Sequence, residues 1–254
     1  MIEQLNQIIS ILEAQIPANP ASPANVRLAK RLEKQLSKYF KALADAFPYY
    51  KLETIYAKNV KESAASEAND FIKPAVLAFR AELELMLADH MAMVYIDGYT
   101  QTTAWAGLAF EGPPIEKAVA WSKTYAGKLV KAIDEETRLR LANVVSDGIK
   151  NKRGVPGISR DLRKSFTDMS KVRADMIART ETAQALGEGF LDSAKKLGVQ
   201  GKSWVTAGDG NVSDECFANE KQGPIPLNQA FISGAMTPPQ HPNCRCAVVP
   251  EYII

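Results

Sequence analysis

The residues best suited to chemistry in this sequence are three cysteines and a histidine near its C-terminal end. Cys244 and Cys246 lie two positions apart, and His241 precedes them in the run His-Pro-Asn-Cys-Arg-Cys. Cys216 lies upstream in the polar segment Ser-Asp-Glu-Cys. Thiolates and imidazole are ligands that tetrahedral Zn²⁺ prefers. If folding brings these four side chains together, they would form a zinc site, and Zn²⁺ is the one cofactor that the sequence suggests.

A second interpretation of the same residues stays open. Zinc sites usually take a pair of thiolates from Cys-x2-4-Cys, whereas the spacing here is Cys-x-Cys. Three small buried thiols and a hydrogen-bonded histidine would leave the same pattern in the sequence. A disulfide is the least favoured alternative, because nothing marks the chain as secreted.

The elements that would position these residues are short strands joined by a long loop. After Gly198 the apolar pattern changes from a period of 3.6 to a period of 2, which predicts strands at 203–206 and 244–249 in a small antiparallel sheet. In such a strand Cys244 and Cys246 would point to one face. The connecting loop, residues 208–240, is so long that its ends must be held in place. A metal or a thiol-lined core would do this.

The wider pattern around the cysteines resembles a known family. The order Ala-Arg-Thr-Glu at 178–181, Lys-Ser-Trp at 202–204, Gly-Pro-Ile at 223–225 and His-Pro-Asn-Cys-Arg-Cys at 241–246 is similar to that of the phage Mu F-like family of minor head, or head morphogenesis, proteins. The resemblance covers roughly residues 150–250.

The resemblance implies a structural protein of a tailed bacteriophage and not an enzyme. It would be a minor capsid protein at low copy in the head interior of the virion, present in the host cytoplasm during assembly. Its partners would be the portal protein, the major capsid or scaffolding protein, and DNA, and its role procapsid assembly, genome packaging or ejection. Arg179, Glu181 and Trp204 would have structural roles, with Arg179 tying its helix to the C-terminal tail.

A metal-dependent enzyme acting on nucleic acid is the alternative. His241 beside Asn243 is superficially like a nuclease site, with histidine as base and Asp209 or Asp214 as metal ligands. Walker A, His-Glu-x-x-His and Gly-x-Ser-x-Gly sequences do not occur, so the usual support for an NTPase or hydrolase is missing.

Composition indicates an ordinary globular protein. The 254 residues are 46% apolar, 24% charged and 8% aromatic, with a net charge of +2, which excludes a disordered or fibrous chain. Such a small net charge does not by itself predict a nucleic-acid partner. No apolar run of 18 residues occurs, so no membrane segment is expected.

The expected fold is α+β and mainly α, with a multi-helix N-terminal region before a small module of one long helix and short antiparallel strands. Gly154, Pro156 and Gly157 place a break at 151–158. The predicted domains are an N-terminal helix with a Pro-rich spacer at 1–23, a helical domain at 24–150 and the C-terminal module at 151–254. Apolar periodicity predicts helices at 2–16, 25–47, 50–72, 75–96, 116–131, 134–150, 159–170 and 172–197. Asp134 would cap the helix at 134–150, and Gly187 would let another element pack closely against the helix at 172–197. His90, on the apolar face of the helix at 75–96, is expected to be a core histidine rather than a ligand or a pH switch.

Two parts of this pattern indicate contacts with partners. The helix at 2–16 precedes a spacer containing Pro17, Pro20 and Pro23; it would lie in a partner's groove or pack back on 25–47. A basic segment at 150–173 would be either a solvated surface or a contact for an acidic partner or DNA. Its cations are Lys150, Lys152, Arg153, Arg160, Arg163, Lys164, Lys171 and Arg173.

Overall fold

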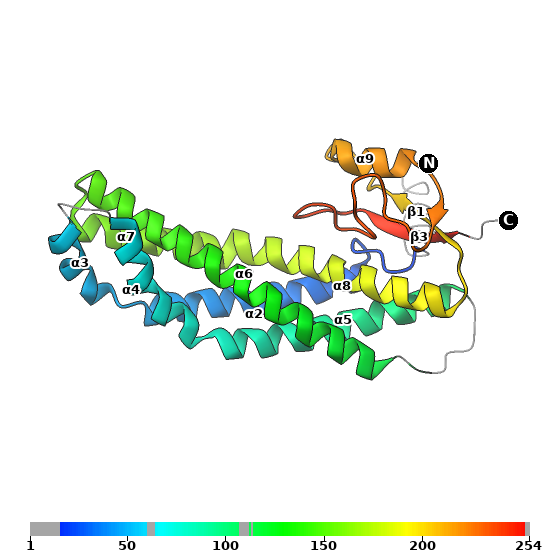
Figure 1. The fold of residues 1–254 in the computed structure, drawn as a ribbon, viewed down its shortest axis with the longest axis horizontal. Coiled ribbons are helices and arrows are strands. Elements are labelled where there is room, and N and C mark those ends of the chain that lie inside the picture. The colour runs from blue at the N-terminus through cyan, green and yellow to red at the C-terminus, as the bar shows by residue number, and fades with distance from the viewer. Residues whose placement is uncertain (1–15, 60–63, 107–111, 113, 252–254) are drawn as a thin grey trace. The chain divides into compact units, whose positions relative to one another are not determined.

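The computed structural model describes residues 16–59, 64–106, 112 and 114–251. Figure 1 shows long helices and, near the C-terminus, a small antiparallel sheet. The predicted fold class, mainly α with a small β part, is therefore confirmed. The helix expected at 2–16 lies outside the described residues except for its last position. None of the described helices combines the length and the apolarity that a membrane span requires.

The helices have the following bounds, and short turns join several of them. A 3-10 turn at Tyr49–Lys51 leads into α3, and a π-helical turn at Met169–Arg173 joins α7 to α8. The helices are α2 Pro23–Ala46, α3 Leu52–Asn59, α4 Ala64–Ala78, α5 Arg80–Trp105, α6 Ile115–Lys150, α7 Gly154–Asp168, α8 Ala174–Lys196 and α9 Asp214–Lys221.

The chain forms two compact units whose segments alternate along the sequence. One contains residues 1–33, 89–122 and 175–254, and the other contains 34–88 and 123–174. Neither unit coincides with the expected domains at 24–150 and 151–254, because α2, α5 and α6 each supply residues to both units.

The unit of residues 34–88 and 123–174 has a core of aromatic and aliphatic side chains. Phe47 makes edge-on contacts with Phe71 and Phe166, with ring centroids 5.4 and 5.5 Å apart. Such edge-to-face pairs stabilise beyond the apolar area that they bury. These contacts fix the end of α2 against α4 and α7.

Three expected helix boundaries in this unit are wrong. The helix α6 is continuous from Ile115 to Lys150, because Asp134 is not a cap but is buried in the middle of the helix and paired with Arg80, with Nε and Oδ2 3.1 Å apart. Pro74 lies inside α4, where the buried neighbours Ile72 and Val76 offset the hydrogen bond that proline cannot make. The break expected at 151–158 is only a three-residue turn, since α7 starts at Gly154.

The other unit contains the sheet, in the order β2-β1-β3. Its strands are β1 Gly201–Val205, β2 Ile225–Pro226 and β3 Ala247–Glu251, and β1 pairs antiparallel with both neighbours. Cys244 and Cys246 were expected in a strand, but β3 begins only at Ala247. The reason is a tight turn in which the Cys244 amide donates to the His241 carbonyl over 3.1 Å and Asn243 adopts a φ of 60°.

Small residues let α8 lie close to its neighbours in the same unit. A Cβ atom added to Gly187 would lie 2.5 Å from Thr237 Oγ1, and one added to Gly98 would lie 2.6 Å from the carbonyl oxygen of Leu186. Side chains are not tolerated at such distances, so the packing role predicted for Gly187 is confirmed. This close approach holds the loop before the cysteines against α8.

The Pro-rich spacer is folded and is not an extended linker. Ala18 has a φ of 54° and its amide donates to Gln101 Oε1 over 3.1 Å. The side-chain amide of Asn25 donates to the Asn19 carbonyl over 2.7 Å. These hydrogen bonds attach residues 17–22 to α5 and to the first turn of α2.

Candidate functional site

The three cysteines lie together in the folded chain. Their Sγ atoms are all within 4.8 Å of one another, and those of Cys216 and Cys244 are 3.7 Å apart. The side chains of Cys216, Cys244 and Cys246 are 0%, 5% and 4% exposed, and all three are free thiols. We call these three residues the cysteine cluster. In the described part of the chain it is the only group of metal-ligating side chains of this kind.

Two separate elements supply the cysteine cluster. Cys216 lies in the first turn of α9, where Ser213 is the N-cap and its Oγ accepts a hydrogen bond from the Cys216 amide over 3.3 Å. Such a cap fixes the start of a short helix. Cys244 and Cys246 come from the segment between the turn at His241 and β3. The cap and the turn therefore hold the thiols in place from opposite ends of the loop.

The surroundings of the cysteine cluster are apolar. Trp204 of β1 and Phe231 pack against it, with their ring centroids 5.1 Å apart and the rings at 78°. Ile225 of β2 completes this small core. The cluster thus forms the centre of the sheet module, and its position is compatible with packed thiols as well as with a metal.

Hydrogen bonds distinguish the three thiols electrostatically. A bond from the Cys246 side chain, together with the backbone amides of Cys246 and Gln240, lowers the pKa of Cys244 to about 5. Burial raises the pKa of Cys216, and the bond to Cys244 followed by burial raises the pKa of Cys246. Donors that point at a sulfur favour its charged form. Of the three thiols, Cys244 is therefore the one whose charged form is favoured most.

The fourth predicted ligand, His241, does not belong to the cysteine cluster in this structure. It is half-buried, and its Nδ1 lies 2.9 Å from the carbonyl oxygen of Pro242. A histidine with Nδ1–H bonded to a carbonyl keeps the lone pair on Nε2. The structure thus brings together Cys216, Cys244 and Cys246 and leaves His241 in the adjacent turn.

Sequence reasoning missed an ion pair that closes the loop beside the cysteine cluster. Arg245 forms a two-pronged contact with Asp209, in which Nη2 and Oδ1 are 2.7 Å apart and Nη1 contacts Oδ2. The hydrogen bond from Arg245 lowers the pKa of Asp209. A planar guanidinium can bond both oxygens of a carboxylate at once. The adjacent Arg-Cys dipeptide was the available signal, but its partner 36 positions away could not be identified from the sequence.

The residues expected to have structural roles are distributed as follows. Trp204 is buried in the core of the sheet module. Arg179 is exposed, and among the described residues its ion pair is with Asp175 of its own helix, 3.8 Å away, and not with the tail. That connection is made by Thr180, whose Oγ1 accepts from the Asn243 amide over 3.1 Å. Glu181 is half-buried on the same helix.

The nuclease alternative gains no support from the geometry. Asp209 is paired with Arg245. Asp214 lies in the first turn of α9, where its negative charge interacts favourably with the positive end of the helix dipole. In the described residues, neither carboxylate joins His241 in a group that could hold a metal ion.

Some cations of the basic segment at 150–173 bond to other residues of their own unit. Arg173 is only 3% exposed: its guanidinium bonds Thr137 Oγ1 over 2.7 Å and pairs with Glu136 over 3.0 Å. Its prediction as a contact for DNA or a partner is therefore wrong. Arg153 pairs with Asp161 over 3.1 Å. The remaining exposed cations are Lys150, Lys152, Arg160, Arg163, Lys164 and Lys171.

His90 has the core role that its position on an apolar helix face predicted. It is 3% exposed, and its Nε2 lies 3.1 Å from Thr182 Oγ1. Burial, followed by the charge of Arg31, lowers its pKa to about 4. His90 is therefore neutral at physiological pH, and it does not lie in the group formed by the three cysteines.

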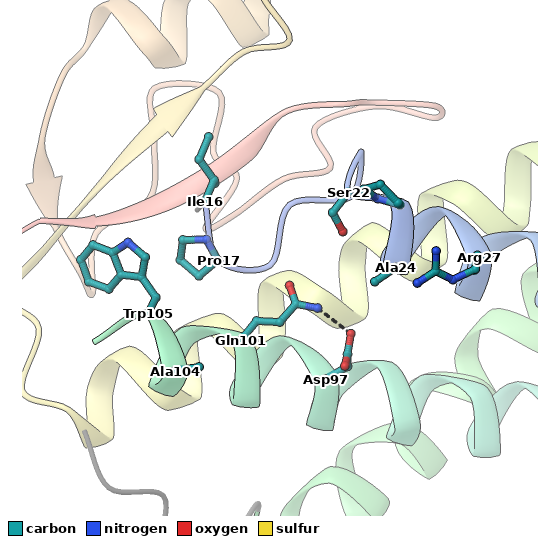
Figure 2. Close-up of a pocket in the computed structure, with 10 residues that line it drawn as sticks. Ile16, Pro17, Ser22, Ala24, Arg27, Asp97, Gln101, Ala104 and Trp105 are labelled. Carbon is teal, nitrogen blue, oxygen red and sulfur yellow. Dashed lines mark hydrogen bonds between the residues drawn. The ribbon is translucent and has the colours of Figure 1, made fainter. Parts of the chain in front are cut away.

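A cavity of about 850 Å³ lies where the spacer meets α5. Figure 2 shows Pro17 and Trp105 at one end and Arg27 and Asp97 at the other, with Gln101 between them. Gln101 donates to Asp97 over 2.6 Å and to Asn25 over 3.0 Å. Its amide is thus occupied by structural bonds, and the cavity walls carry both signs of charge and few free polar groups.

Comparison with known proteins identifies the family of the C-terminal part. Residues 139–249 match the family described as Phage Mu protein F like protein. No curated protein and no solved structure matches the chain. The matched residues include α7, α8, β1, β2, the first part of β3 and the cysteine cluster. The family match thus covers residues 139–249, somewhat less than half of the chain, and agrees with the resemblance that the motifs in the sequence indicated.

Proposed function

We propose that this protein is a minor capsid protein of a tailed bacteriophage that binds the portal at low copy inside the head. In this role it assists procapsid assembly, genome packaging or ejection. The match of residues 139–249 to the Phage Mu F-like family supports the proposal, because a match to that family suggests a head morphogenesis protein. The major capsid or scaffolding protein and DNA are further partners in this proposal.

The exposed part of the basic segment is a surface through which such contacts would form. Arg160 and Lys164 lie four positions apart on α7 and are both exposed, so they lie on the same face of the helix. Arg163 is positioned over the ring of Tyr49 at 4.3 Å, which holds its charge near the surface. A partner with acidic side chains, or DNA phosphate, would be attracted to this face.

A charge-reversal experiment tests this surface. The variant Arg160→Glu with Lys164→Glu is expected to bind purified portal or DNA more weakly, and with a weaker dependence on salt. The matched control reverses Lys128 and Lys131, two exposed lysines of α6 in the same unit. Equal binding by both double variants would show that the basic segment is a solvated surface and not a binding site.

The N-terminal helix predicted at 2–16 is the second contact in this proposal. Its apolar stripe needs a surface to cover it, and a partner's groove is the one that we propose. Because residues 17–22 are bonded to α5 and α2, a deletion should stop at residue 15. The truncated protein is expected to keep its thermal stability and to lose co-sedimentation with portal. A clear loss of stability would instead show that the helix packs on this chain.

The enzyme alternative remains without a specific observation in its favour. The residues that it needs have other contacts. His241 is bonded within its turn, Asp209 pairs with Arg245, and Asp214 lies at the start of α9. A single comparison separates the two functions: an enzyme with His241→Ala would lose nuclease activity and still enter particles. A head protein would show no nuclease activity with or without the substitution.

A further inference from the structure

We infer that the cysteine cluster binds one Zn²⁺ ion, with the thiolates of Cys216, Cys244 and Cys246 as three of its ligands and His241 as the fourth. The ion would join the first turn of α9 to the segment before β3 and so fix the fold of the loop between them. This inference concerns the stability of the sheet module and does not depend on the proposed role in the phage head.

The spacing of the sulfur atoms fits a tetrahedral ion. Two thiolates bound to Zn²⁺ at about 2.3 Å are about 3.8 Å apart, and the Sγ atoms of Cys216 and Cys244 are 3.7 Å apart. The third sulfur, from Cys246, lies within 4.8 Å of both. A small contraction of the group would place all three sulfurs at the distance that a common ion requires.

The convergence of three thiols distinguishes this group from ordinary core cysteines. Cys216 is 28 positions from Cys244, and the two are held by independent devices, a capped helix start and a tight turn. Core packing needs an apolar side chain of the right size at each position, and it does not require every cysteine of the chain to meet at one point. Here all three do.

Backbone donors around Cys244 complete a setting suited to a metal-bound thiolate. The amides of Gln240 and Cys246 both donate to its sulfur. Outer-shell hydrogen bonds of this kind orient metal ligands and stabilise their negative charge. When Zn²⁺ binds, the thiols that are still protonated release their protons to water.

Access to the cluster and the fourth ligand are both available beside Cys244. A cavity of about 250 Å³ is lined by Cys244 and Arg245 together with residues of α2 and α8, which supplies a route for the ion. His241 lies three positions before Cys244, and its Nδ1 is engaged by the Pro242 carbonyl. This leaves Nε2 to bind the ion, a common arrangement for metal-bound histidine. His241 lies outside the group of thiols in this structure, so the turn that carries it would move toward the thiols when the ion binds.

The experiment is metal analysis of the full chain purified without chelator and desalted. The wild-type protein is expected to contain about one zinc per chain, and Cys216→Ser and Cys244→Ser are expected to lose it almost entirely. Val212→Ala is the matched control, because Val212 packs against the cluster without supplying a thiol; this variant should retain zinc. His241→Ala should bind Zn²⁺ at least ten-fold more weakly than the wild type.

A second readout keeps the test valid if a cysteine variant fails to fold. Wild-type protein in which Co²⁺ replaces Zn²⁺ should show the visible and near-ultraviolet absorption of a tetrahedral thiolate site. Far less than one zinc per chain in folded wild-type protein, with no such cobalt spectrum, would overturn the inference. A Cys216–Cys244 disulfide in freshly purified protein, seen as a loss of two hydrogens by mass spectrometry, would also overturn it. Unchanged affinity of His241→Ala would overturn the fourth ligand.

Discussion

The sulfur atoms of Cys216 and Cys244 lie 3.7 Å apart although the residues are 28 positions apart in the sequence. One belongs to the first turn of α9 and the other to the segment that leads into β3. Their contact, with Arg245 paired to Asp209, closes the loop of residues 206–246 on itself. The contact between the two thiols and this ion pair therefore both help to order the loop.

Removal of metal should increase the local opening of this loop more than that of the helices. If Zn²⁺ links α9 to the segment before β3, a strong chelator is expected to increase amide hydrogen exchange at least ten-fold in residues 207–246, because local opening then costs less free energy. Exchange in the middle of α6 should change little. Hydrogen exchange followed by mass spectrometry measures both regions in one sample, and an unchanged loop after chelation would contradict the expectation.

Lys202 carries a buried charge that should destabilise the module at neutral pH. Its side chain is 0% exposed, and in the described residues Nζ has no hydrogen-bond partner and lies 5.3 Å from the ring centroid of Phe231. Burial, followed by the charge of Lys195, lowers its pKa to about 8. Lys202→Met is expected to raise the free energy of unfolding by about 1–3 kcal/mol at pH 7.

The pH dependence gives this prediction a specific sign. Because the pKa of Lys202 is lower in the folded chain than in the unfolded chain, the unfolded state binds more protons between pH 8 and 10. Wild-type stability should therefore rise over that range, and the rise should be smaller in Lys202→Met. Lys128→Met, which removes an exposed lysine of α6 that does not contribute to the shift at Lys202, is the control. Urea unfolding at pH 7 and pH 9.5 makes the comparison.

His90 should make the fold sensitive to acid. Its pKa falls from 6.5 to about 4 on folding, mainly through burial. The stabilisation is complete above the unfolded pKa and is lost as the pH falls from 6.5 to 4, with a total of about 3 kcal/mol. In His90→Gln, which can still bond Thr182, this part of the acid dependence should disappear. Parallel stability curves for the two proteins across this pH range would show that His90 does not titrate as described.

Arg173 should matter for stability, whereas its neighbour Lys171 should not. Arg173→Ala removes a buried guanidinium that donates to Thr137 Oγ1 and to the Ile133 carbonyl and is expected to cost about 2–3 kcal/mol. Lys171 is exposed in the same π-helical turn, so Lys171→Ala should change stability by less than about 0.5 kcal/mol. Chemical denaturation of both variants provides the test. Equal free energies of unfolding would show that the contacts of Arg173 do not stabilise the fold.

Periodicity predicted the elements whose packing follows a repeating face. The apolar stripe around His90 indicated a buried helix, and α5 confirms it. The small residue Gly187 indicated close packing, and its contacts with Thr237 confirm that. The closeness of Cys244 and Cys246 could be predicted from the sequence, because they are only two positions apart. The position of Cys216 beside them needed the fold, because a contact across 28 residues leaves no local signal.

The wrong predictions came from side chains whose partners are distant in sequence. Asp134 was interpreted as a helix cap because a carboxylate at a helix start is common, yet it pairs with Arg80 inside α6. Arg173 looked like part of a charged surface, yet Glu136 and Thr137 bury it. The short helix α9 was missed, although Ser213 before Asp214 and Glu215 is a helix-start signal, because glycine, proline and asparagine dominate the loop around it.

Quantitative mass spectrometry of purified phage heads, and of portal isolated from disrupted heads, measures whether this protein is a low-copy head component bound to the portal. The chain is expected in heads at a small fraction of the copy number of the major capsid protein, and it should remain with the isolated portal. If the chain is absent from purified heads, or if it is as abundant as the major capsid protein while the portal is free of it, the proposed function is wrong.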